Sequence, residues 1–359
     1  MNPDTDGGAP QPTNRARGGL LFALLGVTIA VVALEIVFRL LPVSSSSASG
    51  YYIDANILTY PAGQRFTTAT GWNLKNPQHH KANNYGFVAD HDFSRNPKAL
   101  ALIGDSFVEA SMLAPDERLA AQLESRLPGR IVFAMGGPGS SLLDYAERIR
   151  FASQEFGTRD FVLLLEYGDV GQALCGSGNV HAACLDSETL APRIVKQPAA
   201  SALKSVLRNW ALPQYLFSQL KLDPGSWLVG MERKLGMLPK AEAEPARDSR
   251  SLPPPATQAV IDEFFHRIDR YPKDRLVLIL TGTKNDAEPD SVRDQLRAAA
   301  SRHGAVVLEP TPRIDAYGKE TGLSMHVSPA DAHLNRIALG IVAKQTAAEF
   351  GTPADGSKN

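Results

Sequence analysis

Short apolar runs alternate with amphipathic stretches through most of the chain. Five apolar runs have the length of strands and show little internal alternation, as expected of strands covered on both faces. They lie at 99–103, 130–135, 160–166, 275–280 and 305–309. Helical spacing of apolar residues marks the stretches at 117–127, 141–156 and 257–271. This alternation predicts a parallel sheet covered by helices, within one α/β domain over residues 97–349.

Residues 186–256 interrupt this rhythm, and we interpret them as an insertion in the domain. The insertion contains a helical stretch at about 200–222. A stretch rich in proline and charged residues follows at 239–256, which predicts a loop. The two ends of the chain, 1–18 and 350–359, are polar and are predicted to be disordered tails.

Residues 42–96, which precede the domain, show little periodicity. A Ser-rich tether at 43–50 is followed by aromatic, Asn and Gly residues, so we expect an irregular lead-in that packs on the main domain. His79 and His80 are adjacent, but no Asp, Glu or Cys lies at a compelling metal-binding spacing from them. We therefore expect a solvated loop at these histidines and predict no metal site.

The most apolar run lies at residues 20–38 and predicts a transmembrane anchor over 19–41. As a helix the run would span ~28 Å, about the thickness of a bilayer core. Its only charge, Glu35, is near one end, where it can reach the interface. A cleaved signal peptide is the alternative, because small residues follow at 44–49, although the run is longer than the usual core of a signal peptide.

The charges around this run favour one orientation in the membrane. Arg15 and Arg17 precede it and only Arg39 follows closely, so the N-terminal tail is expected in the cytoplasm. The bulk of the chain would then lie on the periplasmic side of the inner membrane. The composition, 43% hydrophobic and 21% charged, is that of a globular protein. A net charge of -1 argues against nucleic-acid binding as the main function.

The two cysteines of the chain, Cys175 and Cys184, lie close together in the sequence. In an oxidising compartment they would close a small loop as a disulfide, which we predict. A metal site would need two further ligands, and only His181 is nearby. The alternative is a pair of reduced, buried thiols.

Polar and glycine-rich motifs follow several of the predicted strands. These motifs are GDSF at 104–107, GGPGS at 136–140, YGD at 167–169 and DAHLN at 331–335. The first three follow the first three strands directly, and the last comes after the fifth strand and a long loop. Ligands in open α/β sheets sit beyond the carboxyl ends of the strands. We therefore expect the four motifs to converge at one edge of the sheet.

The converging residues suit nucleophilic catalysis. A serine hydroxyl needs an adjacent base, so Ser106 is the candidate nucleophile and His333 the candidate base. Asp331, two residues from the histidine, can orient the imidazole and stabilise its cation. The backbone N–H groups of Gly139 and Ser106 could form an oxyanion hole, in which loss of one donor costs roughly 100- to 1000-fold in rate.

Each of these residues also has a structural alternative. Ser106 and Asp331 could instead cap helices, and His333 could be a surface residue that starts the last helix. Gly139 could be only a turn glycine. Asp105, beside the candidate nucleophile, is expected to stabilise its loop by hydrogen bonds rather than to act as an acid or base.

The order of the four motifs resembles that of the SGNH/GDSL hydrolase family. NNYGF at 83–87 is similar to the lead-in of the membrane-anchored bacterial members, and the resemblance covers roughly residues 80–348. It implies a flavodoxin-like three-layer α/β/α sandwich with a parallel sheet, and hydrolysis or transfer of acyl groups, often acetyl from carbohydrate. It also implies the roles given above to the serine, the glycine and the Asp–His pair, and no metal or organic cofactor.

The third motif departs from the family pattern. The family has an Asn before the Asp, and its amide is the third oxyanion donor, whereas here Gly168 precedes Asp169. Asn179 in the cysteine-bounded loop, or Asn285 after the fourth strand, could replace that donor. An oxyanion hole of backbone donors alone and weakened catalysis are the other options. Asp169 is expected to stabilise its loop, with a direct role in the site as the alternative.

These observations predict a serine-dependent esterase or O-acyltransferase that forms an acyl-Ser106 intermediate. Acetyl on exported or cell-surface polysaccharide is the expected group. The expected partners are an acyl ester or polysaccharide, the inner membrane through residues 20–38, and polysaccharide-export proteins. The alternative, supported by the missing amide at Gly168, is a catalytically weakened protein of the same fold that serves in carbohydrate binding or polysaccharide assembly.

Overall fold

A computed structural model describes most of the chain. The described residues are 14–45, 48–166, 168–177, 182–198, 206–220, 222, 254–282, 290–329 and 331–351. The predicted tails lie mainly outside them, although helix α1 begins at Asn14 and α12 continues to Gly351. Most of the predicted loop at 239–256 also lies outside the described residues, but its last three residues begin helix α9 at Pro254, so the loop prediction is wrong there.

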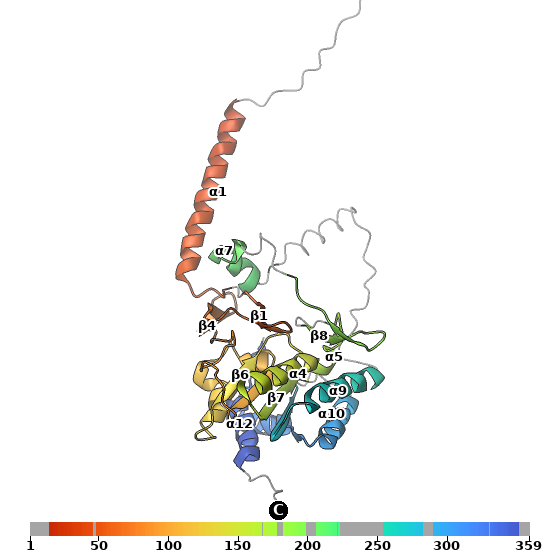
Figure 1. Cartoon of the computed structure of the whole chain (residues 1–359). Coiled ribbons are helices and arrows are strands. Elements are labelled where there is room, and N and C mark those ends of the chain that lie inside the picture. Colours follow the sequence, from red (N-terminus) through yellow and green to blue (C-terminus); the bar gives the residue numbers. More distant parts are fainter. Residues whose placement is uncertain are drawn as a thin grey trace, which may run out of the picture.

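The centre of the domain is a five-stranded sheet in the order β11-β10-β7-β5-β6, and every neighbouring pair is parallel (Figure 1). Its strands are β5 (Leu100–Gly104), β6 (Val132–Gly136), β7 (Asp160–Glu166), β10 (Arg275–Thr281) and β11 (Val306–Leu308). Each falls on one of the predicted apolar runs. The strands are covered on both faces, which explains why they read as continuous apolar runs without alternation.

Helices cover both faces of this sheet. One face carries α4 (Leu142–Phe151), the π-helical turn η2 (Ala152–Phe156), α9 (Pro254–Asp269) and α10 (Asp290–Arg302). The other carries α3 (Leu119–Glu124), α11 (Thr311–Thr321) and α12 (Arg336–Gly351). Side chains of β7 alternate between the two cores, with Phe161 and Leu163 in the first and Val162 and Leu164 in the second. The predicted three-layer α/β/α sandwich with a parallel sheet is confirmed.

The lead-in packs on the domain as predicted, through Ile57, Phe87 and Phe93, and it is irregular over 82–96. The prediction of an irregular chain is wrong over 50–81. This stretch folds into two antiparallel hairpins, β1 (Gly50–Asp54) with β2 (Ile57–Thr59) and β3 (Arg65–Thr70) with β4 (Lys75–Lys81). Both hairpins have register irregularities, which break the two-residue period that would reveal strands. His80 lies on β4 and is buried, with its ring bonded to Thr68 and Arg118, so the predicted solvated loop is also wrong there.

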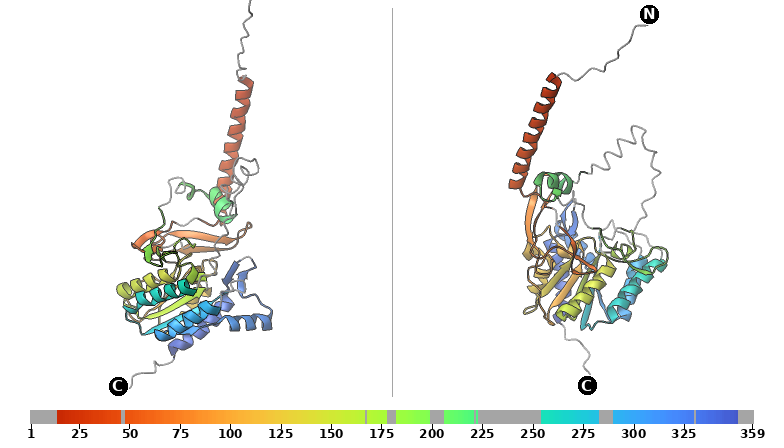
Figure 2. Two further views of the ribbon diagram at one scale, coloured as in Figure 1. Left: turned by 90° about the vertical axis from the view of Figure 1, so that its right-hand side faces the viewer. Right: turned by 45° about the horizontal axis from the view of Figure 1, so that its top comes forward.

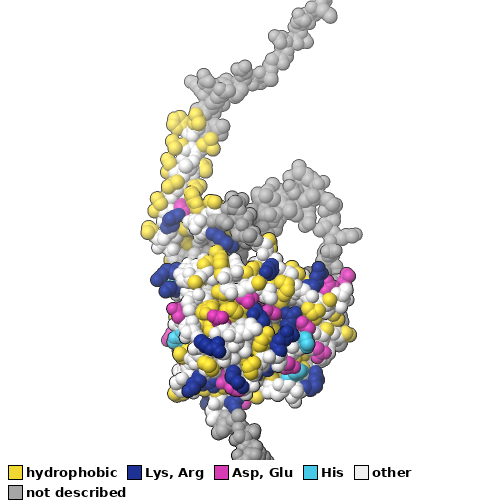
Figure 3. All heavy atoms as spheres, viewed as in Figure 1, with side chains coloured by type: hydrophobic (Ala, Val, Ile, Leu, Met, Phe, Trp, Pro, Cys, Tyr) yellow, Lys and Arg dark blue, Asp and Glu magenta, His cyan; other side chains and the backbone are white. Residues whose placement is uncertain are grey.

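The N-terminal helix α1 (Asn14–Leu40) stands away from the α/β domain, and hydrophobic side chains cover it (Figures 1 and 3). Its segment Leu21–Leu40 is long and apolar enough to cross a bilayer or to serve as a signal sequence. Figure 2 shows that α12, at the end of the described chain, lies on the side of the domain away from α1.

Two small units lie in the insertion or at its start. The hairpin of β8 (Ala183–Leu185) and β9 (Pro192–Ile194) lies beside α4, and its Ala183 N–H donates to Asp144 of the α4 capping box. The helical turns α7 (Ala211–Gln214) and η3 (Tyr215–Gln219) lie within the predicted helical stretch and pack beside the lower end of α1 in Figure 1.

Candidate active site

Ser106 is the first residue of a short helix, α2 (Ser106–Glu109), which starts directly after β5. Asp105 occupies the cap position, and its Oδ1 accepts a hydrogen bond of 2.8 Å from the Phe107 N–H. The alternative in which Ser106 caps the helix is therefore wrong. The expected loop-stabilising role of Asp105 is confirmed, because its carboxylate holds the turn that presents the Ser106 hydroxyl.

The helix α2 sits tightly against the end of the neighbouring strand. A Cβ added to Gly136, the last residue of β6, would lie 2.3 Å from the Glu109 N–H nitrogen. Only glycine fits at this point, so the glycine-rich motif after β6 first serves to let α2 approach the sheet. The hydroxyl of Ser106 is thereby brought to the carboxyl edge of the sheet, beside the loop that carries Gly139.

His333 and Asp331 belong to a hairpin rather than to the start of the last helix. The hairpin pairs β12 (His326–Ser328) with β13 (Asp331–Leu334). Asn335 accepts the N–H groups of Ile337 and Ala338 and so caps α12. The structural alternatives for His333 and Asp331, as helix-start and capping residues, are therefore wrong.

The hydroxyl, the imidazole and the carboxylate form one hydrogen-bonded chain. His333 Nε2 lies 2.8 Å from Ser106 Oγ, and His333 Nδ1 lies 2.5 Å from Asp331 Oδ1. The same Asp331 oxygen accepts the His333 backbone N–H at 3.1 Å. The Phe107 ring packs on the imidazole at 4.4 Å between centroids, which further fixes its orientation. The structure thus brings together three side chains separated by up to 227 residues.

A cleft of about 700 Å³ opens beside the Ser106 hydroxyl. Apart from the triad, its wall includes hydroxyl and amide side chains: Thr68, Thr70, Asn76, Ser111, Ser218, Gln219 and Ser328. The remaining lining residues are Ala69, Gly71, Asp105, Phe107, Met112, Glu166 and Ala332. Neutral polar side chains thus make up half of the wall outside the triad, and the wall is assembled from the α/β domain, the β3–β4 hairpin and η3.

Asp169 lies on α5 (Gly168–Gly171) and is buried away from this cleft. Its carboxylate accepts hydrogen bonds of 2.9 Å from the Tyr145 hydroxyl and from the Glu166 N–H. Burial raises the pKa of Asp169 well above its ordinary value, and the nearby Asp105 carboxylate adds to the shift. Burial likewise raises the pKa of Asp105. These contacts match the expected loop-stabilising role of Asp169.

The structure describes some of the residues predicted to supply oxyanion donors. Gly139 has a φ of 73°, typical of a turn glycine, and its N–H has no hydrogen-bond partner in the described part of the chain, but it does not line the cleft. Gly168 starts α5 and adds no side-chain donor. Asn179 and Asn285, the proposed substitutes, lie outside the described residues. The oxyanion role of Gly139 therefore stays a prediction.

One site-supporting residue escaped the sequence analysis. Arg148, on α4, is fully buried, and its Nη1 donates to the Gly104 carbonyl at 2.8 Å and to Ser140 Oγ at 2.9 Å. It therefore joins the end of β5 to the glycine-rich loop after β6. The signal was present, because an arginine on the otherwise apolar side of an amphipathic helix is unusual unless it has buried partners.

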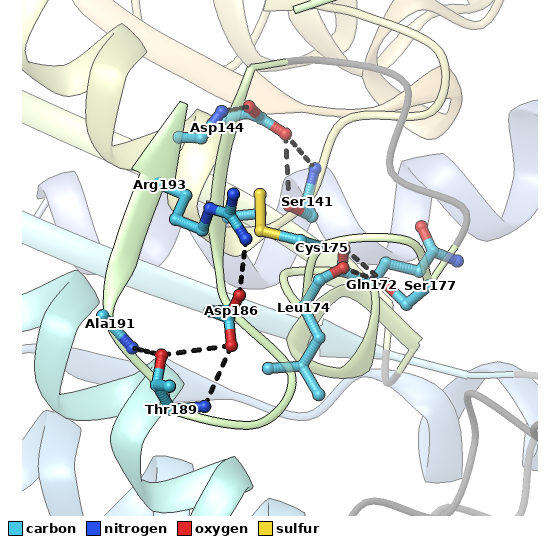
Figure 4. Close-up of a disulfide and its surroundings, with 12 residues drawn as sticks. Ser141, Asp144, Gln172, Leu174, Cys175, Ser177, Asp186, Thr189, Ala191 and Arg193 are labelled. Carbon is cyan, nitrogen blue, oxygen red and sulfur yellow. Dashed lines mark hydrogen bonds and ion pairs between the residues drawn. A yellow bond between two sulfur atoms is a disulfide. The ribbon is translucent and has the colours of Figure 1, made fainter. Parts of the chain in front are cut away.

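The predicted disulfide between Cys175 and Cys184 is confirmed. Figure 4 shows it beside the α4 capping box, in which Ser141 and Asp144 are bonded to each other. Because Ser141 directly follows the glycine-rich loop, the cross-linked segment also supports that loop through the Ala183–Asp144 hydrogen bond.

No family model and no curated protein matches the chain. Solved structures do resemble it. A lipolytic protein of the G-D-S-L family from Veillonella parvula is 11% identical, with a TM-score of 0.39 over 71% of this chain and 99% of that one. A lipase/acylhydrolase from Enterococcus faecalis is 10% identical, with a TM-score of 0.38 over 70% and 95%. A variant of the acetyl-xylooligosaccharide esterase Axe2 from a Geobacillus species is 12% identical, with a TM-score of 0.36 over 74% and 99%.

The fold and the geometry of the site together define the class of fold to which this chain belongs. A parallel, helix-covered sheet presents a serine after its first strand in the chain, β5, and an Asp–His pair from near the C-terminus at the same edge. This combination is an SGNH hydrolase-like fold, as the motif order predicts.

Proposed function

We propose that this chain is a serine-dependent esterase or O-acyltransferase. The observation that carries the proposal is the hydrogen-bonded chain from Ser106 Oγ through His333 to Asp331, at 2.8 and 2.5 Å. The first distance is within the reach that a nucleophile and its base require, and the second joins the base to the carboxylate. The third group orients the base, which completes the arrangement that activates a serine.

The reaction proceeds in two halves. Ser106 Oγ attacks the ester carbonyl carbon while its proton passes to His333 Nε2, and Asp331 stabilises the resulting imidazolium. The tetrahedral intermediate expels the alcohol, which takes the proton from His333 and leaves an acyl-Ser106 ester. Water or a sugar hydroxyl then attacks this ester by the same route, so hydrolysis and acyl transfer differ only in the second acceptor. The backbone N–H groups of Ser106 and Gly139 are the proposed oxyanion donors.

An acetylated, exported or cell-surface polysaccharide is the proposed substrate. The hydroxyl and amide side chains of the cleft can exchange hydrogen bonds with sugar hydroxyls, and they suit a neutral polar ligand better than a long acyl chain. We also propose that α1 crosses the inner membrane with the domain on the periplasmic side, near polysaccharide-export proteins. The disulfide supports this placement, because disulfides persist in oxidising compartments.

Turnover of p-nitrophenyl acetate by the full-length protein in detergent tests the proposal. Ser106→Ala and His333→Ala should each lower kcat by at least roughly 10³-fold. Matched controls are Ser125→Ala and His91→Ala, both at exposed positions, which should keep wild-type rates. A transferase would hydrolyse slowly but carry an acetyl group on Ser106, visible in the mass of its peptide.

The missing amide donor at Gly168 favours one other function. If several esters are turned over at the background rate by the wild type and both variants, and no acyl group is captured, the chain is a carbohydrate-binding or assembly protein on this fold.

A further inference from the structure

The insertion is fixed to the end of the apolar helix α1. The Glu35 carboxylate accepts hydrogen bonds from the N–H groups of Ala211 and Leu212, at 3.0 and 2.9 Å. The rings of Phe38 and Tyr215 stack with centroids 4.3 Å apart. These contacts join residues that are about 175 positions apart in the chain, so α7 and η3 are held beside the last turns of α1 (Figure 1).

The same segment forms a wall of the cleft. Gln219 lines the cleft, and its Nε2 donates to the carbonyls of Ala69 and Gly71, at 2.9 and 2.7 Å. Its Oε1 accepts the Ser44 N–H at 3.2 Å, and Ser44 Oγ donates to the Ala69 carbonyl. The wall of the cleft is therefore tied directly to the chain that leaves α1.

The distance from the apolar segment to this wall is short. Ser44 is four positions after Leu40, the end of α1, and a fully extended chain of that length spans at most about 14 Å. The headgroup layer on each side of a bilayer core is about 5–7 Å thick. If α1 crosses the bilayer, the cleft wall at Ser44 lies in or just above the headgroup layer.

Exposed aromatic residues lie on this side of the molecule. Trp72, in the turn between β3 and β4, is 73% exposed, and its carbonyl accepts the Tyr215 hydroxyl at 2.9 Å. Trp210 and Phe217 are 43% and 42% exposed on the segment that packs against α1. Trp and Tyr are enriched where a protein meets lipid headgroups. These residues lie on or beside the segment that packs against the apolar helix α1. The surface that they would contact is therefore that of the bilayer.

We propose that the cleft faces the membrane surface and takes an acylated carbohydrate that is linked to a lipid, whose sugar enters the cleft while the lipid stays in the bilayer. The proposal rests on the esterase or transferase function. It adds that the substrate arrives from the membrane, and that Trp72 and its aromatic neighbours hold the cleft against the headgroups.

The placement of the cleft can be tested without any enzymatic activity. The chain has two cysteines, both in the disulfide, so Trp72→Cys introduces the only free thiol for a fluorophore. The labelled full-length protein is placed in nanodiscs that contain lipids with a nitroxide on the headgroup. The control is Ile131→Cys, an exposed apolar residue just before β6 at the amino edge of the sheet. Strong quenching at position 72 and little at 131 is expected; equal quenching would overturn the proposal.

The substrate is tested in vesicles that hold the full-length protein. The probes are a synthetic lipid with an acetylated sugar headgroup, the same acetylated sugar without lipid, and p-nitrophenyl acetate. Confinement to one surface should raise the apparent kcat/KM for the lipid-linked sugar on the order of 100-fold over the free sugar. Trp72→Ser, outside the cleft lining, should lower turnover of the lipid-linked sugar by about fivefold, equivalent to about 1 kcal/mol, and leave p-nitrophenyl acetate turnover unchanged.

The outcomes separate the two proposals. Equal turnover of free and lipid-linked sugar, insensitive to Trp72→Ser, would overturn the membrane-borne substrate while the esterase function stands. Absence of turnover for every ester, with quenching at position 72 intact, would overturn the enzymatic function and its substrate but keep the membrane-facing cleft.

Discussion

Asp331 offers a test in which two substitutions separate charge from orientation. One carboxylate oxygen, Asp331 Oδ1, accepts both the ring Nδ1–H and the backbone N–H of His333. In Asp331→Asn the amide oxygen can take the same place and keep both hydrogen bonds. The variant should therefore retain the imidazole orientation and lose the negative charge that stabilises the imidazolium.

The size of each loss follows from this geometry. Two charges roughly 4 Å apart interact by about 4 kcal/mol at an effective dielectric constant near 20. At 1.36 kcal/mol for each factor of ten, Asp331→Asn should lower kcat by roughly 10³-fold. Asp331→Ala removes the orienting bonds as well, so its loss should be larger, roughly 10⁴-fold. The KM should change little, because the carboxylate acts when the imidazole is charged.

The assay is kcat for p-nitrophenyl acetate, measured for the full-length wild type and both variants, with the thermal midpoint recorded to confirm folding. The matched control is Asp262→Asn on α9, an exposed aspartate whose substitution should leave kcat unchanged. An Asp331→Asn variant within tenfold of the wild type, or an Ala variant more active than the Asn variant, would refute this reasoning.

Three further predictions concern stability. Burial raises the pKa of Glu109 to about 7, from about 4.5 in the unfolded chain, so only the folded state retains this proton between these two pH values. The free energy of unfolding should therefore fall by up to about 3 kcal/mol from pH 4.5 to 7. Glu109→Gln should remove that slope in urea titrations, and its amide oxygen can still accept the Tyr60 hydroxyl. Replacing Cys175 and Cys184 by serine should lower the free energy of unfolding by about 2.5 kcal/mol, the loop-closure value for a separation of 9 residues, and a reductant titration of the wild type should give a similar loss. Arg148→Ala should lower the free energy of unfolding by about 1.5–3 kcal/mol, measured by denaturant unfolding, because two buried hydrogen bonds from a charged donor are lost; an unchanged midpoint would contradict its role in joining β5 to the glycine-rich loop.

The sheet and the triad were predictable for one physical reason. Strands covered on both faces must be apolar throughout, and parallel strands place their carboxyl ends at one edge. The residues that follow β5 and the Asp–His pair near the C-terminus could therefore be assigned to one site without any contact information. Ser106 and His333 meet as expected, although 227 residues separate them.

The parts that could not be predicted depend on long-range contacts of single groups. Hairpins β1–β2 and β3–β4 are short and irregular in register, so they leave no clear period in the sequence. The attachment of the insertion to α1 depends on the Glu35 carboxylate meeting two backbone N–H groups, which no spacing reveals. These contacts determine which elements wall the cleft, and hence where a substrate would approach.

Covalent labelling with a fluorophosphonate, followed by peptide mass spectrometry, tests the central claim most directly. This reagent reacts with a serine whose hydroxyl is activated by a neighbouring base. The account predicts modification at Ser106 in the wild type, none in Ser106→Ala, and greatly slowed modification in His333→Ala. A wild-type protein that stays unlabelled, or is labelled equally fast in His333→Ala, would contradict an activated nucleophile at this position.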